Sequence, residues 1–168
     1  MYEMAMQMQK EENKEEKWFE MLKKSSEKGY LKATHKTGMQ YVKKKNKEEA
    51  IKQLERAIEK GYSESKLQLA LIYEQGNLVE QNLEKSVLLF QSACKDNHSK
   101  SMFYFAVFKL KHFEHEMLDI VDLLERSCDL GYSRSFYRLS LIYYRGNKYI
   151  EKDFPKALLL LEKSSEKG

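Results

Sequence analysis

Two histidines and two carboxylates lie close together in the sequence at His112-Phe-Glu-His115-Glu116. Imidazole and carboxylate groups are the ligands that zinc takes in proteins, and a site needs three or four of them to converge, usually with supporting residues around them. This segment offers two nitrogen ligands at the end of a predicted helix. We therefore interpret it as an exposed loop between helices, and the sequence predicts no metal and no cofactor.

Sequence motifs for catalysis are absent from the chain. It contains no nucleophile elbow, no HExxH motif, no Walker loop and no glycine-rich dinucleotide turn. The Asp and Glu residues lie mostly in lysine-rich stretches, where nothing apolar would raise a carboxyl pKa. We predict that the protein is not an enzyme and has no catalytic residues and no small-molecule substrate.

The composition favours a fold of packed helices, and two cysteines without a dense framework fit a reducing compartment. Of 168 residues, 42% are hydrophobic and 33% charged, while one proline and seven glycines leave little material for the turns of an all-β fold. No apolar run is long enough to span a membrane, and the N-terminus lacks the basic region of a secretory signal. The net charge of +4 is too balanced to indicate nucleic acid. We expect a cytoplasmic protein with no membrane span.

A repeat emerges when the Gly-Tyr pairs are aligned. Each repeat ends an amphipathic stretch at a glycine or asparagine, which we call the stop, and the stops are roughly 35 residues apart, the spacing of two-helix repeats. The stops are Gly29, Gly61, Asn97, Gly131 and Gly168. Seven residues before each stop is a large apolar residue: Leu22, Leu54, Phe90, Leu124 and Leu161. Four before it is a small residue: Ser25, Ala57, Ala93, Ser127 and Ser164.

A second helix is predicted after each stop, with a small residue nine positions on. These small residues are Gly38, Ala70, Ala106 and Ser140. A small residue between bulky ones indicates that another helix approaches closely. One helix pair cannot bury its own apolar face, so neighbouring pairs must stack. The pattern predicts an all-α fold, a right-handed α-solenoid of antiparallel helix pairs with a concave surface.

These positions resemble the Sel1-like repeat, a relative of the tetratricopeptide repeat. The matching residues of the second repeat are Leu69-Ala70, Tyr73, Gly76, Lys85-Ser86 and Ala93, and those of the fourth are Leu139-Ser140, Tyr143, Gly146, Asp153, Lys156-Ala157 and Ser164. The first repeat has a shorter, tetratricopeptide-like connection. The third has Lys109 and His112 where the family has Tyr and Gly. The resemblance covers residues 15–168 and implies an adaptor or scaffold for protein complexes.

We expect a single Sel1-like array over residues 1–168. Its approximate repeats are 1–29 (partial), 30–61, 62–97, 98–131 and 132–168. Because Asn13-Lys14-Glu15-Glu16 resembles Asn46-Lys47-Glu48-Glu49, a short first helix over 1–10 with a methionine-rich face is predicted. The last helix, 156–167, keeps Leu158 to Leu161 in a row on its outer face, so either more repeats follow or this end binds something.

The two cysteines, Cys94 and Cys128, occupy the same register in consecutive repeats. Packed helices lie about 8–10 Å apart, whereas a disulfide needs Cα atoms within about 7 Å. We therefore predict two reduced thiols in the core. The cysteine-rich secreted branch of the family pairs cysteines within each repeat, and this chain lacks that pattern.

The candidate partner-binding residues lie on one face of the first helix of each pair, three, seven and fourteen residues after the stop. They are Lys32, Lys36, Lys43, Lys100, Tyr104, Lys111, Arg134, Arg138 and Arg145. The second repeat has Glu64, Gln68 and Gln75 at these positions. In related solenoids the first helices line the concave side, so by analogy we predict a basic groove for an acidic or phosphorylated peptide or the C-terminus of a protein. The alternative is that these cations only form a solvated helix face.

Three readings of the function stay open. The leading one is a non-enzymatic scaffold that binds a protein or peptide on the concave, partly basic surface. A nucleic-acid or acidic-surface binder would use the same cations, although acidic residues spread through the second helices oppose a polyanion. A structural module would self-associate through the last helix. The aromatic residues Tyr73, Tyr143 and Tyr144, with Phe103, Phe105 and Phe108, have helical spacing that favours packing over base stacking.

Overall fold

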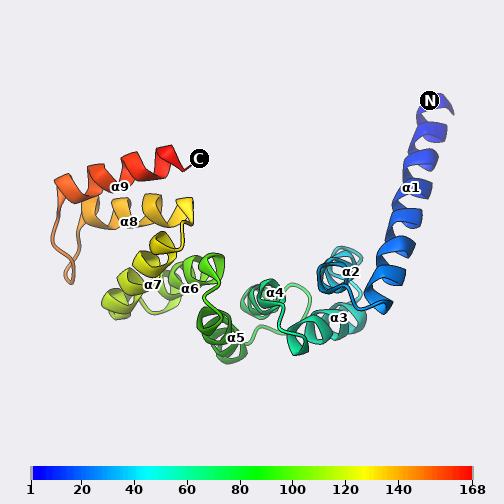
Figure 1. The fold of residues 1–168 in the computed structure, drawn as a ribbon, viewed down its shortest axis with the longest axis horizontal. Helices are drawn as coiled ribbons and strands as arrows, with labels where there is room; N and C mark the ends of the chain where they lie inside the picture. The colour runs from blue at the N-terminus through cyan, green and yellow to red at the C-terminus, as the bar shows by residue number, and fades with distance from the viewer. Residues whose placement is uncertain (1, 168) are drawn as a thin grey trace. The chain divides into compact units, whose positions relative to one another are not determined.

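The computed structural model describes the backbone of residues 2–167 and the side chains of residues 14–167. In this part of the chain the backbone forms nine α-helices and one short 3-10 helix, with no strand (Figure 1). Within each of its two units, helices that follow one another in sequence pack against one another, which confirms the predicted all-α fold of sequential helix pairs. The contacts divide the chain into two units, residues 1–83 and 84–168, which we describe separately.

Unit 1 contains α1 (Tyr2–Glu27), α2 (Leu31–Lys43), α3 (Lys47–Glu59) and α4 (Ser63–Gln75). α2 packs against both α1 and α3, and α3 packs against α4. The prediction of a separate helix over 1–10 is wrong, because α1 runs without a break to Glu27. Nothing in Asn13-Lys14-Glu15-Glu16 forces a turn, since Lys and Glu are good helix formers. The methionine-rich face falls outside the described side chains.

Unit 2 contains α5 (Leu83–Lys95), α6 (Ser99–His112), α7 (Met117–Asp129), α8 (Ser133–Arg145) and α9 (Phe154–Glu166), with the 3-10 helix η1 (Glu114–Glu116) between α6 and α7. α6 packs against α7, α7 against α8, and α8 against α9. The aromatic rings of Phe90, Phe105 and Phe108 join α5 to α6 in the core, with centroids 5.3 and 5.4 Å from Phe90.

Four of the five predicted stops end their helices in one shared geometry, and the fifth, Gly168, lies outside the described residues. Gly29, Gly61, Asn97 and Gly131 all have φ between 55° and 89°, the left-handed conformation that glycine and asparagine tolerate best. At each of them the N–H of the stop donates to the carbonyl three residues back, and the next N–H donates to the carbonyl five residues back. This is the Schellman motif, which satisfies the last carbonyls of the helix.

The small register positions are places of close contact, as predicted. A Cβ added to Gly38 of α2 would lie 3.0 Å from Cγ of Leu54 and 3.3 Å from its backbone nitrogen. In unit 2, Ser127 of α7 lies fully buried, with its Oγ 2.6 Å from Oγ of Ser135 on α8. Small side chains at these positions therefore set how closely consecutive helices approach.

Candidate functional site

The first turns of α6 and α8 bring predicted cations together with aromatic rings. Tyr132, the residue before α8, has its ring centroid 5.3 Å from that of Phe103 on α6, and Phe103 in turn lies 5.3 Å from Tyr104. Burial and the neighbouring Tyr104 raise the pKa of Tyr132, while Arg134 and Lys100 act in the opposite direction. Tyr104, Tyr132, Lys100 and Arg134 thus lie close enough to interact, and we call these four the basic-aromatic cluster.

The electrostatics of these two helix starts favour an anion. A helix N-terminus carries a partial positive charge that acidic residues in the first turn ordinarily offset. The first turns of α6 and α8 contain no acidic residue and carry Lys100 and Arg134 instead. Two helix N-termini, each partly positive, therefore lie at this surface together with two cationic side chains. A negatively charged group would be stabilised there.

The other predicted cations are distributed along the same helices. Arg138 is half-buried and lies one turn after Arg134. Lys111 and Arg145 are exposed at the C-terminal ends of α6 and α8. In unit 1, three exposed lysines follow one face of α2: Lys32, Lys36 and Lys43. The structure thus brings Lys100, Tyr104 and Arg134 into one cluster and leaves the other predicted residues outside it.

Tyr132 is a site residue that the sequence reasoning did not select. It follows a stop, as do Tyr30 and Tyr62, so the Gly-Tyr pair was used only as a marker of the repeat. The available signal was that an aromatic residue just before a helix start lies next to the cation at the second helical position, here Arg134. Arg134 lies close enough to Tyr132 to oppose the rise in the pKa of its hydroxyl.

Lys109 explains why the third repeat departs from the family pattern. In the fourth repeat Lys156 of α9 lies with its Nζ 2.7 Å from the hydroxyl of Tyr143 on α8 and 4.0 Å from the ring centroid. In the third repeat Lys109 takes the place of that tyrosine, and Asp119 takes the place of that lysine. Nζ of Lys109 donates to Asp119 at 3.1 Å and also to Glu116. An ion pair between the two helices has replaced a tyrosine–lysine contact.

The two carboxylates keep Lys109 charged although its side chain is mostly buried. Burial disfavours the charged form, but hydrogen bonds to Glu116 and Asp119 outweigh this effect and raise the pKa of Lys109. Lys109 is therefore committed to joining α6 to α7 and is not available to a partner. Its Nζ also lies 5.4 Å from the ring centroid of Phe105.

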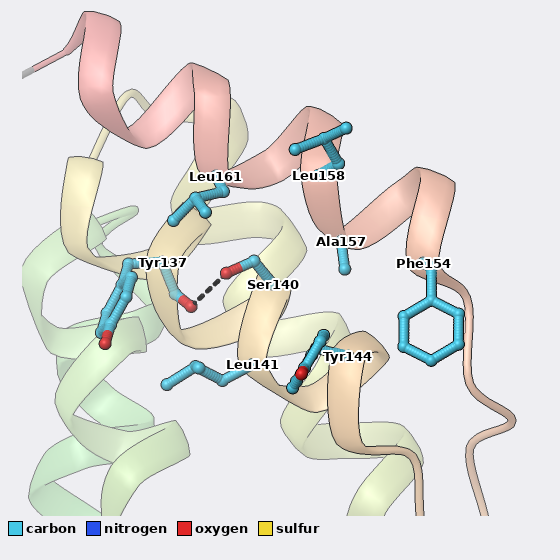
Figure 2. Close-up of a pocket in the computed structure, with 8 residues that line it drawn as sticks. All are labelled: Tyr137, Ser140, Leu141, Tyr144, Phe154, Ala157, Leu158 and Leu161. Carbon is cyan, nitrogen blue, oxygen red and sulfur yellow. Dashed lines mark hydrogen bonds between the residues drawn. The ribbon is translucent and has the colours of Figure 1, made fainter.

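A second surface of a different character lies between α8 and α9. It is a groove of about 450 Å³ lined only by uncharged residues. The lining residues are Tyr137, Ser140, Leu141, Tyr144, Phe154, Ala157, Leu158 and Leu161. Figure 2 shows Leu141 and Tyr144 of α8 and Leu158 and Leu161 of α9 around it, with the Ser140 hydroxyl bonded to the carbonyl of Tyr137 at 2.8 Å. The groove has no side chain that could do acid–base chemistry at neutral pH.

The interpretation of the aromatic residues as packing groups holds for most of them. Phe105 and Phe108 are buried, and Phe103, Tyr73 and Tyr143 are half-buried. Tyr144 differs, because it is exposed and lines the groove, with its ring centroid 5.6 Å from that of Phe154 in an edge-on arrangement. The helical spacing that places Tyr144 on a packing face is correct, but no helix covers that face in the described residues.

The histidine segment is built into the helix junction. The ring of His112 lies 4.7 Å from that of Phe108, and Nε2 of His115 lies 3.8 Å from Oε1 of Glu116. Among the described residues, no group of three or more His, Cys, Asp or Glu side chains is placed to hold a metal ion. Nor does any described helix combine the length and hydrophobicity needed to cross a lipid bilayer.

Cys94 and Cys128 are free and buried, as predicted from their register. Burial raises the pKa of the Cys94 thiol to about 11 and that of Cys128 to about 12. A thiol reacts as its thiolate, so both should be nearly inert at pH 8 in the folded protein.

We expect the native protein to react with a thiol-specific disulfide reagent at pH 8 at least about 100-fold more slowly than the urea-unfolded protein, because an unfolded thiol has a pKa near 8.5. Since the folded pKa values are raised, the thiols' contribution to stability is complete below about pH 8.5 and is lost as the pH rises toward 11. Equal labelling rates for the native and unfolded states would contradict this assignment.

The fold defines a helical-repeat protein. The Sel1 repeat family model matches residues 34–62, 63–98 and 135–168, which together exceed half of the chain. The chain therefore belongs to the Sel1 repeat family. The unmatched segment between the last two of these ranges, residues 99–134, includes Lys109 and His112, the two departures identified in the third repeat. Sel1 repeats generally mediate protein interactions and are generally non-catalytic.

Solved structures of two bacterial proteins share the fold. One is a protective antigen of uropathogenic Escherichia coli strains that displays an SLR fold, with 22% sequence identity, a TM-score of 0.78, and coverage of 89% of this chain and 33% of that chain. The other is a Sel1 repeat protein from Oxalobacter formigenes, with 20% identity, a TM-score of 0.74, and coverage of 83% and 59%. The chain thus spans only a part of either protein's length. No curated protein is significantly similar in sequence.

Proposed function

We propose that this protein is a non-enzymatic scaffold that binds an acidic segment of a partner protein at the first helices of its repeats. The observation that carries the proposal is the basic-aromatic cluster of unit 2, where Lys100 and Arg134 stand at helix starts that lack any acidic residue. A carboxylate or phosphate group there would interact with both cations and with both helix dipoles.

The aromatic members of the cluster suit a peptide better than a bare ion. Tyr104 and Tyr132 are half-buried, each combines an aromatic ring with a hydroxyl, and Tyr132 lies near Lys100 and Arg134. Tyrosines and arginines are enriched at protein interfaces, because they combine apolar area with directed polar groups. An acidic side chain flanked by an apolar one is the simplest peptide that fits this surface.

Arg138 and Arg145 extend the proposed surface along α8, and Lys111 extends it along α6. In unit 1 the lysines of α2 offer a further set of cations. The two buried, unpaired thiols support our proposal that the protein acts in the reducing environment of the cytoplasm.

The test is a charge reversal measured with a defined probe, a fluorescent peptide of alternating Glu and Leu residues. We expect Arg134→Glu/Arg138→Glu to weaken binding at least tenfold, about 1.4 kcal/mol or more, because two attractive charges become repulsive. We also expect the affinity of the native protein to fall steeply between low and high salt. Fluorescence anisotropy on the full-length protein measures both effects.

A matched control carries the same change in net charge away from the cluster. Lys95 and Lys163 are exposed in the last turns of α5 and α9, so Lys95→Glu/Lys163→Glu should bind as the native protein does. Affinity that ignores salt, or equal losses in the two double variants, would overturn the acidic-partner proposal. Tighter binding of generic duplex DNA than of the peptide, with a larger salt slope, would replace it with nucleic-acid binding.

A further inference from the structure

The groove between α8 and α9 has an equivalent one repeat earlier in the sequence. That equivalent is the surface formed by α6 and α7 in unit 2, which another helix already covers. Aligned by their stops, Tyr137 and Leu141 of α8 correspond to Phe103 and Val107 of α6. In the same way, residues Phe154, Leu158 and Leu161 of α9 correspond to Met117, Val121 and Leu124 of α7. Both surfaces are apolar at every one of these positions.

The two surfaces differ in what covers them. α8 lies on the earlier one, with Oγ of Ser135 2.6 Å from Oγ of Ser127 on α7 and the ring of Tyr132, the residue just before α8, against Phe103 on α6. Under that cover Leu124 is 0%, Met117 2% and Val121 8% exposed. Their counterparts Leu161, Phe154 and Leu158 are 46%, 56% and 60% exposed.

The exposure of these three side chains to water is costly, and all three line the same groove. Each large apolar side chain that moves from water into a packed environment contributes about 1.5–3 kcal/mol. The side chains of the groove line one volume of about 450 Å³ and come from the two neighbouring helices α8 and α9 (Figure 2), so one occupant can bury several of them together. Its walls carry no charge, and Tyr144 and Phe154 meet edge-on at one end.

We propose that this groove is a second binding site, which takes an amphipathic α-helix of a partner protein packed as α8 packs on α6 and α7. Because the two surfaces are equivalent and α8 covers the earlier one, the occupant should resemble α8. The partner helix offers a small residue for close approach, as Ser135 does on α8, and a large aliphatic residue one turn later, as the buried Leu139 does. The recognition mode is a helix in a groove, and it is apolar where the basic-aromatic cluster is charged.

The probe that tests the site is a fluorescent peptide of residues 133–145, the segment that covers the equivalent surface. We expect it to bind the full-length protein saturably, and we expect Leu158→Lys to weaken that binding at least tenfold, because a charge would enter the groove. Leu88→Lys on α5 is the matched control, since Leu88 is as exposed as Leu158 but lies outside the groove. A peptide in which the residue at 139 is Asp should not bind.

Salt separates this site from the basic-aromatic cluster. Binding of the helical peptide should change little between low and high salt and should persist in Arg134→Glu/Arg138→Glu. Absence of binding, or binding that Leu158→Lys leaves intact, would overturn the proposal. Sedimentation at two protein concentrations gives the remaining outcome: a dimer that Leu158→Lys abolishes would also overturn it, because a second copy of the protein would then be the occupant.

Discussion

Phe90→Ala is expected to lower the free energy of unfolding by about 3–5 kcal/mol, the cost of removing a large aromatic side chain from a packed core. Phe90 is fully buried in α5, and its ring lies 5.3 Å from that of Phe105 and 5.4 Å from that of Phe108, both on α6. Aromatic pairs contribute beyond the area they bury. The substitution therefore leaves a cavity and removes two ring contacts at once.

The midpoint of urea unfolding of the full-length protein, followed by circular dichroism, measures this loss. Because each helix in a repeat protein is stabilised by its immediate neighbours, hydrogen exchange should also show the largest loss of protection in α5 and α6. Leu88→Ala on the exposed face of the same helix is the control and should stay within about 0.5 kcal/mol of the native value. Similar losses for the two variants would show that α5 does not pack on α6 as described.

Gly146→Asn is expected to cost about 2–4 kcal/mol, through backbone strain together with a steric clash. Gly146 ends α8 with φ 60° and ψ 173°, a conformation essentially limited to glycine. A Cβ there would lie 2.7 Å from Cγ of Lys152 and 3.1 Å from the carbonyl oxygen of Ile150. The backbone oxygen cannot move away cheaply, because the turn after α8 closes by a hydrogen bond from the Asn147 N–H to that same oxygen at 2.8 Å.

The protein supplies its own control for this prediction. Gly131 also has positive φ, but a Cβ there meets nothing within 4 Å, and asparagine already occupies the equivalent stop at Asn97 with φ 55°. Gly131→Asn should therefore cost less than about 1 kcal/mol, the usual difference between glycine and a tolerated residue. Thermal unfolding of both variants decides the matter: a change of about 1 kcal/mol shifts the midpoint by about 2–4 °C in a protein of this size. Equal shifts would contradict the strain argument.

The helices and their ends could be predicted from the sequence because both depend on the conformational preferences of nearby residues. A glycine or asparagine at a stop allows positive φ, and the apolar residue seven positions earlier marks the packing face, so both follow from the residues themselves. Gly38 was predicted to be a point of close approach because it is a small residue between bulky ones, and Leu54 lies against it in the structure. The break expected after residue 10 failed because a short similarity between two segments does not terminate a helix.

Partners that lie far apart in sequence could only be found in the structure. Lys109 looked like a departure from the repeat, and its pairing with Asp119 became visible once α6 and α7 lay side by side. Tyr132 joined the basic-aromatic cluster because the ring of Phe103, from the preceding repeat, lies against it. These contacts depend on distances between helices, which a periodic pattern does not encode.

The sequence by itself determined the helix pairs, their stops and the register of the apolar positions, because each of these depends on the conformational preferences of residues within one or two turns. Leu161 shares its register and its apolar character with Leu54, Phe90 and Leu124, and the sequence predicted that Leu158 to Leu161 lie on the outer face of the last helix. Only the tertiary structure decided which of these side chains are covered: Leu158, Leu159 and Leu161 are exposed, whereas Leu160 is buried, as are Leu54, Phe90 and Leu124. The physical reason is that burial belongs to a side chain and its neighbour together, and the neighbour is set by packing.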